Sequence, residues 1–190
     1  MKRITLFLSA LFLANFAADA QGIQGTLVNG PTPNCIRVRI KNNTAATLAG
    51  DLVSFRFAIR IPDQGAGNPT ITATSLMVTP GSVTYPPAYT EAGFRYYDVS
   101  AVLNGGNPVS IAAGAEQDAF NVVFANGTGI STVELVAKAF TGPGSAGPNN
   151  ATEFYVALNT GDVTDNVNRF YNNGTNSSGL SNTPTLSVVG

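Results

Sequence analysis

The chain has 190 residues, the size of one ordinary domain. Only 11% of its residues are charged, against roughly 25% in an average soluble domain. The absence of His excludes a Ser-His-Asp triad, a Cys-His dyad and an imidazole metal site. A net charge of −1 without a basic block argues against nucleic-acid binding. The hydrophobic content of 44% is too high for a disordered chain.

The N-terminus has the pattern of a secretory signal peptide. Two basic residues precede an apolar run that ends at Phe16 and is too short to span a bilayer comfortably, and residues 18–20 are Ala-Asp-Ala, a small-x-small cleavage pattern. We predict that residues 1–20 are the signal peptide and that cleavage falls between Ala20 and Gln21. The protein is then secreted or held at the cell surface, and no later stretch predicts a membrane span.

Cys35 is the single cysteine, so the sequence excludes an intramolecular disulfide. A secreted protein without a disulfide must fold on its hydrophobic core alone, and a chain of this size buries about 70% of its unfolded surface. We interpret Cys35 as a small residue at the start of a strand. A reactive or intermolecular thiol is the alternative.

Apolar and polar residues alternate with period 2 in several short runs, which is typical of strands with one buried face. Such alternation, or enrichment in β-branched and aromatic residues, occurs at 35–41, 53–61, 70–79, 93–103, 120–124, 132–138 and 154–158. No comparable stretch has a helical stripe with caps. The alternation predicts a core built on Val53, Phe55, Phe57, Ile59, Phe120, Val122, Phe124, Leu135, Phe154 and Val156.

Clusters of Gly, Asn and Pro separate these runs and indicate turns. Many short strands between turns predict an antiparallel sandwich or barrel. We expect an all-β, two-sheet antiparallel sandwich of jelly-roll or cohesin-like type, with seven to nine strands, over residues 21–171. Residues 172–190 are rich in Asn, Gly and Ser. They predict a linker or surface loop with a possible final strand at 185–189.

Carboxylates are the remaining source of acid–base chemistry. A glycosidase needs two of them at a set distance across a cleft, but most carboxylates here lie in turns or at outward strand positions. Asp162, Asp165 and Asn166 could offer oxygen ligands to calcium, although no EF-hand loop is present. We therefore assign no catalytic residue, metal site or cofactor, and we predict that the protein is not an enzyme.

Aromatic residues crowd together between positions 85 and 97. In the strand that starts near Gly93, the apolar residues occupy the odd positions, so Phe94, Tyr96 and Asp98 should point outward. Exposed aromatic rings beside a carboxylate can stack on sugars or anchor a protein partner. Alternatively, this segment is a loop that covers the edge of the sandwich with its own Tyr residues.

The order of these segments resembles a cohesin-like domain of the carbohydrate-binding-module type of sandwich. Residues 35–42 resemble its second strand, 48–63 are similar to its turn and long third strand, 73–81 to its fourth strand, and 118–124 and 131–136 to its sixth and seventh strands. The resemblance implies a module of the kind found at the N-terminus of secreted modular bacterial surface proteins. It also implies that one sheet face binds partners. The chain is then either a complete module or the first module of a longer protein.

Two strand orders give different outer faces. A simple meander would place the cations of strands 35–41 and 53–61 on one face. The cohesin-like order instead groups strand 53–61 with strands near 94–103, 117–125 and 152–159. We adopt the second order, which predicts a binding face of Arg56, Arg60, Tyr96, Asp98, Asn121 and Tyr155.

The alternative for this face is a solvated sheet surface on which Arg pairs with Asp98. If the face binds a partner, we expect the double change Arg60→Ala with Tyr96→Ala to weaken surface attachment while leaving the melting temperature nearly unchanged.

These observations favour a secreted, non-enzymatic interaction module that binds a protein partner or a glycan at the cell surface. The alternatives are a small carbohydrate-active enzyme and a structural surface or fimbrial subunit whose strand edges pair between copies.

Overall fold

The computed structural model describes residues 22–78, 82–85, 87–103, 105–126, 130, 132–136, 154–172 and 175–177. The predicted signal peptide, its cleavage site and the possible final strand at 185–189 lie outside these residues. Within them the chain forms fourteen strands, β1 to β14, and one short 3₁₀ helix at Gly65–Gly67. No helix among the described residues is long and apolar enough to cross a membrane.

One sheet has six strands in the order β14-β13-β1-β2-β9-β4. Its long members are β1 (Ile23–Asn29), β2 (Cys35–Asn42), β9 (Glu116–Ala125) and β4 (Thr70–Ser75), which pair antiparallel. The short strands β13 (Phe170–Asn172) and β14 (Thr175–Ser177) form a hairpin, and β13 pairs parallel with β1.

The other sheet is built around β3 (Leu48–Pro62) and β7 (Phe94–Val102). Its order is β12-β11-β3-β7-β5, with β10 and β8 also paired to β3 and β6 paired to β7. The short strands are β5 (Ser82–Thr84), β6 (Tyr89–Glu91), β8 (Pro108–Ile111), β10 (Glu134–Val136), β11 (Tyr155–Leu158) and β12 (Gly161–Asp162).

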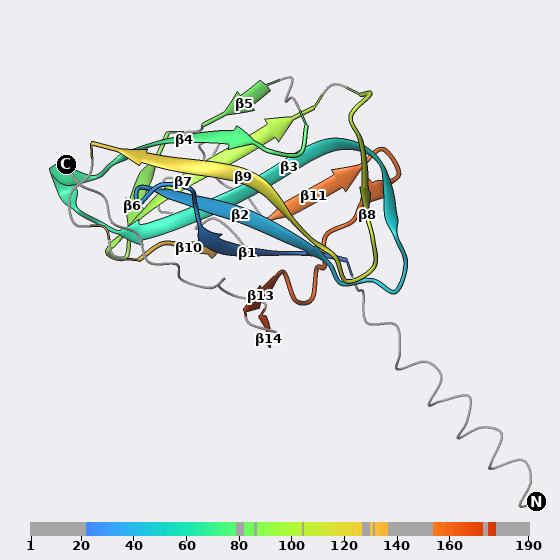
Figure 1. Ribbon diagram of the computed structural model, residues 1–190. Helices are drawn as coiled ribbons and strands as arrows, with labels where there is room; N and C mark the ends of the chain where they lie inside the picture. Colours follow the sequence, from blue (N-terminus) through green and yellow to red (C-terminus); the bar gives the residue numbers. More distant parts are fainter. Residues whose placement is uncertain are drawn as a thin grey trace, which may run out of the picture.

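The two sheets pack face to face, and Figure 1 shows β1, β2 and β9 as a layer in front of β3, β7 and β11. This arrangement confirms the predicted two-sheet, mostly antiparallel β-sandwich. The strands outnumber the seven to nine expected because eight of them are pieces of two to four residues.

The core is a set of aromatic rings between the sheets. Phe55 and Phe57 of β3 meet Phe120 of β9 at centroid distances of 5.1 Å and 5.3 Å. Phe154 lies 5.9 Å from Phe55 and 5.5 Å from Phe170. Every predicted core residue except Val53 is buried.

Val53 is only half-buried because β3 contains a bulge at this position. Ala157 pairs with Ser54, but the next residue, Leu158, pairs with Leu52, so Val53 has no opposite residue in β11. A bulge reverses the inside–outside alternation beyond it. Leu52, 2% exposed, therefore takes the core position predicted for Val53.

The alternation did not predict β1, although β1 lies inside the six-stranded sheet. Ile23 and Leu27 are fully buried, but Gly25 stands at the inward position between them. A side chain is excluded there, since a Cβ on Gly25 would lie 2.5 Å from the Phe154 ring. The glycine that marks this close approach also interrupts the apolar pattern.

Part of the segment predicted as a linker or loop belongs to the sandwich. Asn172 and Thr175–Ser177 are strand residues, and their hairpin extends the six-stranded sheet. Cys35 starts β2 as predicted and is 3% exposed. Burial raises the pKa of its thiol, which disfavours the reactive thiolate.

Candidate partner-binding face

The structure brings together five of the six predicted site residues. Arg56, Arg60, Tyr96, Asp98 and Tyr155 all lie in the sheet built on β3 and β7. They occupy positions that alternate with core residues such as Phe57 and Val99, so they belong to its outer face.

Asn121 does not belong to this face, and its predicted placement was wrong. It lies on β9, which pairs with β2 and β4 in the six-stranded sheet. Its side-chain oxygen accepts a hydrogen bond from Arg37 Nε at 3.1 Å. Strands β2 and β3 do lie in different sheets, so the arginines of β2 are separated from Arg56 and Arg60 as the adopted order predicts.

The register of the strands arranges the outer face in three rows across the sheet. Each row runs through one outward position of β3, namely position 56, 58 or 60. The first row is Tyr155, Arg56, Ser100 and Thr84; the second is Val136, Ala58 and Asp98; the third is Glu134, Arg60, Tyr96 and Tyr89.

The second and third rows are largely buried, contrary to the expectation that Tyr96 and Asp98 are exposed. Tyr96 is 1% exposed and Asp98 is 3% exposed. Tyr96 clusters with Ala58 and Val136, and its ring stacks on Tyr89 at 5.0 Å with 7° between the planes. The outer face thus carries a small hydrophobic cluster of its own. Tyr96→Ala would lower the melting temperature, so the proposed double substitution cannot separate binding from stability.

Arg60 is held within the same region. Its Nε donates to Glu134 Oε2 at 2.7 Å, and its guanidinium lies 4.1 Å from the centroid of the Phe94 ring. Burial alone would lower the pKa of Arg60, but Glu134 and Tyr96 outweigh that effect and raise it. The charge of Arg60 is therefore satisfied inside the protein.

The first row is open to solvent. Arg56 is exposed, and no described carboxylate lies within ion-pair distance of its guanidinium. Tyr155 beside it is half-buried, and Val102, which follows Ser100 on the same face of β7, is 47% exposed. We call this region the Arg56 surface and define it as Arg56, Thr84, Ser100, Val102 and Tyr155.

The sequence pattern did not identify Thr84, Ser100 and Val102 as parts of this region. One sequence signal marks both the covered and the open part of this face, namely an apolar residue at an outward position. Ala58 and Val136 at such positions are buried, whereas Val102 is 47% exposed, so the signal alone does not tell the two parts apart.

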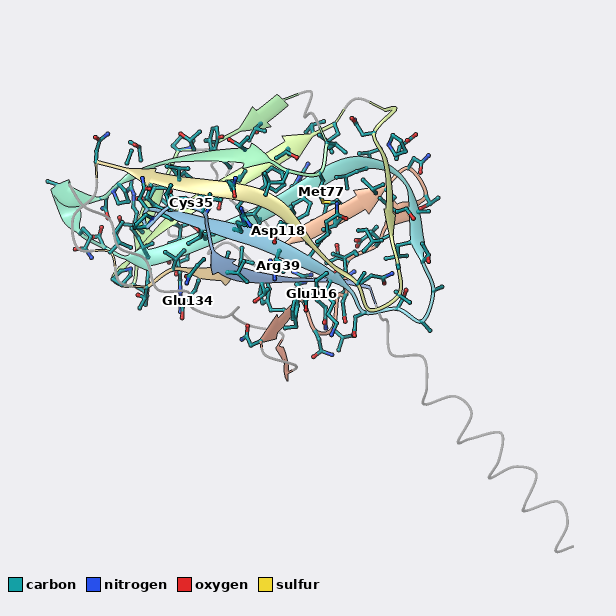
Figure 2. All side chains as sticks on the ribbon, in the orientation of Figure 1. Cys35, Arg39, Met77, Glu116, Asp118 and Glu134 are labelled. Atoms are coloured by element: carbon teal, nitrogen blue, oxygen red, sulfur yellow. The ribbon has the colours of Figure 1, made fainter. Side chains whose placement is uncertain are left out.

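The six-stranded sheet carries a contrasting outer face, on which two arginines are paired with carboxylates. Asp118 accepts bonds from Arg39 Nε at 2.6 Å and Arg37 Nη1 at 3.0 Å, and Glu116 lies 3.6 Å from Arg39 Nη1. Figure 2 shows Arg39, Glu116 and Asp118 together on β2 and β9, away from Glu134 on β10. Burial acts to raise the pKa of Asp118, but the two arginines hold it below its ordinary value.

The carboxylates considered for calcium serve as internal hydrogen-bond acceptors. Asp165 is buried, and its Oδ2 accepts from Gln24 Nε2 while its Oδ1 accepts from the amides of Val167 and Asn168. Asp162 accepts from the Thr164 amide and from Asn166 Nδ2. Three of these four carboxylate oxygens bond within the loop that leads into β13, and Asp165 Oδ2 ties that loop to β1. The described residues contain no group of three or more His, Cys, Asp or Glu side chains that could hold a metal ion.

The remaining aromatic residues of the 85–97 cluster have separate places. Tyr97 points inward as predicted, and its hydroxyl donates to the carbonyl of Pro69 at 2.7 Å. Tyr85 lies at the edge of the six-stranded sheet, where its hydroxyl bonds to Ala73 of β4. Tyr85 therefore covers an edge of the sandwich, as the alternative interpretation of this segment predicts.

Comparison of the chain with protein-family models, with curated proteins and with solved structures finds no match. The resemblance to cohesin-like domains therefore stays a prediction from the order of the segments.

Proposed function

We propose that the chain is a secreted, non-enzymatic interaction module that binds a protein partner at the cell surface through the Arg56 surface. The observation that carries the proposal is the environment of Arg56. It is an exposed cation without a described acidic neighbour, next to a Tyr ring and an exposed Val.

This combination of residues suits a protein interface. Arg and Tyr are enriched among residues that dominate binding energy, and an apolar neighbour helps to exclude water from such contacts. Three other arginines of the two sheets contrast with Arg56, because Arg37, Arg39 and Arg60 each have a carboxylate within 3.0 Å. Lys41 and Arg95 differ from Arg56 in being half-buried. A partner that offers a carboxylate to Arg56 and an apolar surface to the Tyr155 ring can therefore bind without first breaking an ion pair.

A glycan is the less favoured partner. Sugar platforms offer an open aromatic ring face, but Tyr96 is buried and Tyr89 stacks on it. Tyr155 is the one aromatic ring of the Arg56 surface, and it is half-buried.

Binding of the purified, labelled chain to the surface of producing cells tests this proposal. The variant Arg56→Glu with Tyr155→Ala should lose at least about tenfold in affinity, because hot-spot substitutions cost 2 kcal/mol or more. Lys41→Glu is the matched control, since it makes the same charge change on the other sheet. Its affinity should stay near that of the wild type.

Treatment of the cells separates the two kinds of partner. Protease treatment should abolish binding, whereas periodate oxidation of surface sugars should leave it intact. Equal loss in the Arg56 variant and the Lys41 control would contradict the proposed surface. Binding that survives protease but not periodate would contradict a protein partner.

A further inference from the structure

Strand β4 forms one edge of the six-stranded sheet, since among the described residues it pairs with β9 alone. A strand in this position presents its outward N–H and C=O groups to any extended chain that approaches. The sequence Thr70–Ser75 contains no charged residue, no Pro and no Gly, and its register with β9 runs without a shift. β4 therefore lacks the charges, prolines and bulges that commonly protect a sheet edge.

Tyr85 occupies the middle of this edge. It follows β5 of the other sheet, and its hydroxyl accepts a hydrogen bond from the Ala73 amide at 2.9 Å and donates one to the Ala73 carbonyl at 2.9 Å. A residue of a neighbouring antiparallel strand makes the same two kinds of bond to its partner. The Tyr85 hydroxyl thus stands where the next strand of the sheet would pair.

The Tyr85 side chain contacts β4 from a solvent-exposed position outside the core. Tyr85 is 42% exposed, and its ring lines a cleft of about 270 Å³ together with Ile71 and Arg95. Tyr97, which lines the same cleft, is in contrast 5% exposed and packed in the core. Rotation of the Tyr85 side chain away from Ala73 would break both of these hydrogen bonds without disturbing the core, to which Tyr85 does not belong.

We propose that the β4 edge is a self-association surface, which the Tyr85 hydroxyl keeps closed and which pairs antiparallel with β4 of a second copy when that hydroxyl leaves Ala73. A second copy fits because the strand is self-complementary about a two-fold axis. Two uncharged strands bring no like charges opposite each other. The exposed Thr70, Thr72 and Thr74 of the two copies would then form one continuous row across the dimer interface.

Amide hydrogen exchange of the wild type tests the role of the hydroxyl. The Ile71 and Ala73 amides point to the same edge, because edge-facing groups alternate along a strand. The Ala73 amide should exchange at least tenfold more slowly than the Ile71 amide, since only Ala73 donates to Tyr85. Equal exchange rates would overturn the proposal.

Light scattering over a wide range of concentration tests the association itself. The wild type should remain a monomer, and Tyr85→Phe, which keeps the ring and removes the hydroxyl, should approach the dimer mass as concentration rises. Tyr155→Phe is the matched control on the other sheet and should stay monomeric. Tyr85→Phe combined with Thr72→Lys should also stay monomeric, because each copy then brings a cation to the dimer interface.

Far-UV circular dichroism establishes that each variant is folded, and Tyr85→Leu replaces Tyr85→Phe if the latter does not fold. A folded variant without the hydroxyl that stays monomeric at every concentration would overturn the proposal. So would a dimer that persists after Thr72→Lys, because its interface would then lie elsewhere. Neither result bears on partner binding at the Arg56 surface, which lies on the other sheet.

Discussion

Gly25→Ala should destabilise the protein, because the Phe154 ring occupies the space that a side chain would need. The added Cβ would lie 2.5 Å from Cε2 and 2.6 Å from Cζ of Phe154. The ring cannot retreat, since it is 1% exposed and lies between Phe55 and Phe170 at centroid distances of 5.9 Å and 5.5 Å. Overpacking of this kind costs about 1–3 kcal/mol, a large share of a typical total stability of about 5–15 kcal/mol.

The second half of the prediction is a double-mutant cycle. Phe154→Ala alone should cost about 3–5 kcal/mol. Gly25→Ala made in that background should cost little, because the new methyl group then enters vacated space. The coupling energy should therefore be about 1–3 kcal/mol and favourable. Phe154→Leu serves in the same cycle if the Ala variant does not fold.

Urea unfolding followed by circular dichroism measures these changes as shifts in midpoint at constant slope. Gly105→Ala is the control, because its Cβ would meet no atom within 4 Å. Its stability should change by less than about 0.5 kcal/mol. If the costs of Gly25→Ala and Phe154→Ala simply add, the ring does not fill the space above Gly25 and the explanation for the glycine is wrong.

Three further outcomes follow from the core, the ion pairs and the signal sequence. Phe57→Ala should cost about 3–5 kcal/mol in urea unfolding, whereas the exposed Val123→Ala should change stability by less than about 0.5 kcal/mol; equal effects would contradict the inward placement of Phe57. Because the folded state lowers the pKa of Asp118, its stabilising contribution is present above the ordinary Asp value of about 3.9 and is lost as pH falls through the lowered value. Asp118→Asn should therefore flatten the fall in stability below about pH 4, and an unchanged profile would contradict this. The mass of the secreted protein should correspond to a chain that starts at Gln21, and a mass that includes Met1 would contradict the predicted cleavage.

The sequence predicts the β-sandwich well where alternation is unbroken. Phe55, Phe57 and Ile59 are all fully buried as the period-2 pattern requires, and so are Ile36 and Val38 on the other sheet. Alternation specifies two faces, so it succeeds wherever one face of a strand meets the core.

The errors in the fold arise where backbone geometry overrides the pattern. Because of a bulge at Val53, Leu52 rather than Val53 packs in the core. The inward Gly25 interrupts the apolar alternation of β1, so the pattern did not predict that strand. Both features depend on partners distant in the sequence, namely β11 and the ring of Phe154. The alternation of residues within one strand cannot predict contacts with such distant partners.

The candidate site was predictable only in part. Alternation predicts which residues of a strand point outward, but it predicts neither the sheet to which the strand belongs nor whether other residues bury the outward side chains. Asn121 does point outward, but from the wrong sheet, where it bonds to a residue 84 positions away. Tyr96 and Asp98 lie on the predicted face but are buried there. Tyr96 is buried against Tyr89 and Val136, which come from two other strands.

The Arg56 surface is tested most directly by site-specific photo-cross-linking on producing cells. A photoreactive residue placed at Ser100 lies beside Arg56 on the outer face of β7, whereas one placed at Thr72 lies on the outer face of the other sheet. We expect a protease-sensitive cross-linked product from position 100 and none from position 72. A product from position 72 alone, or from neither position while the chain remains bound to cells, would contradict this expectation.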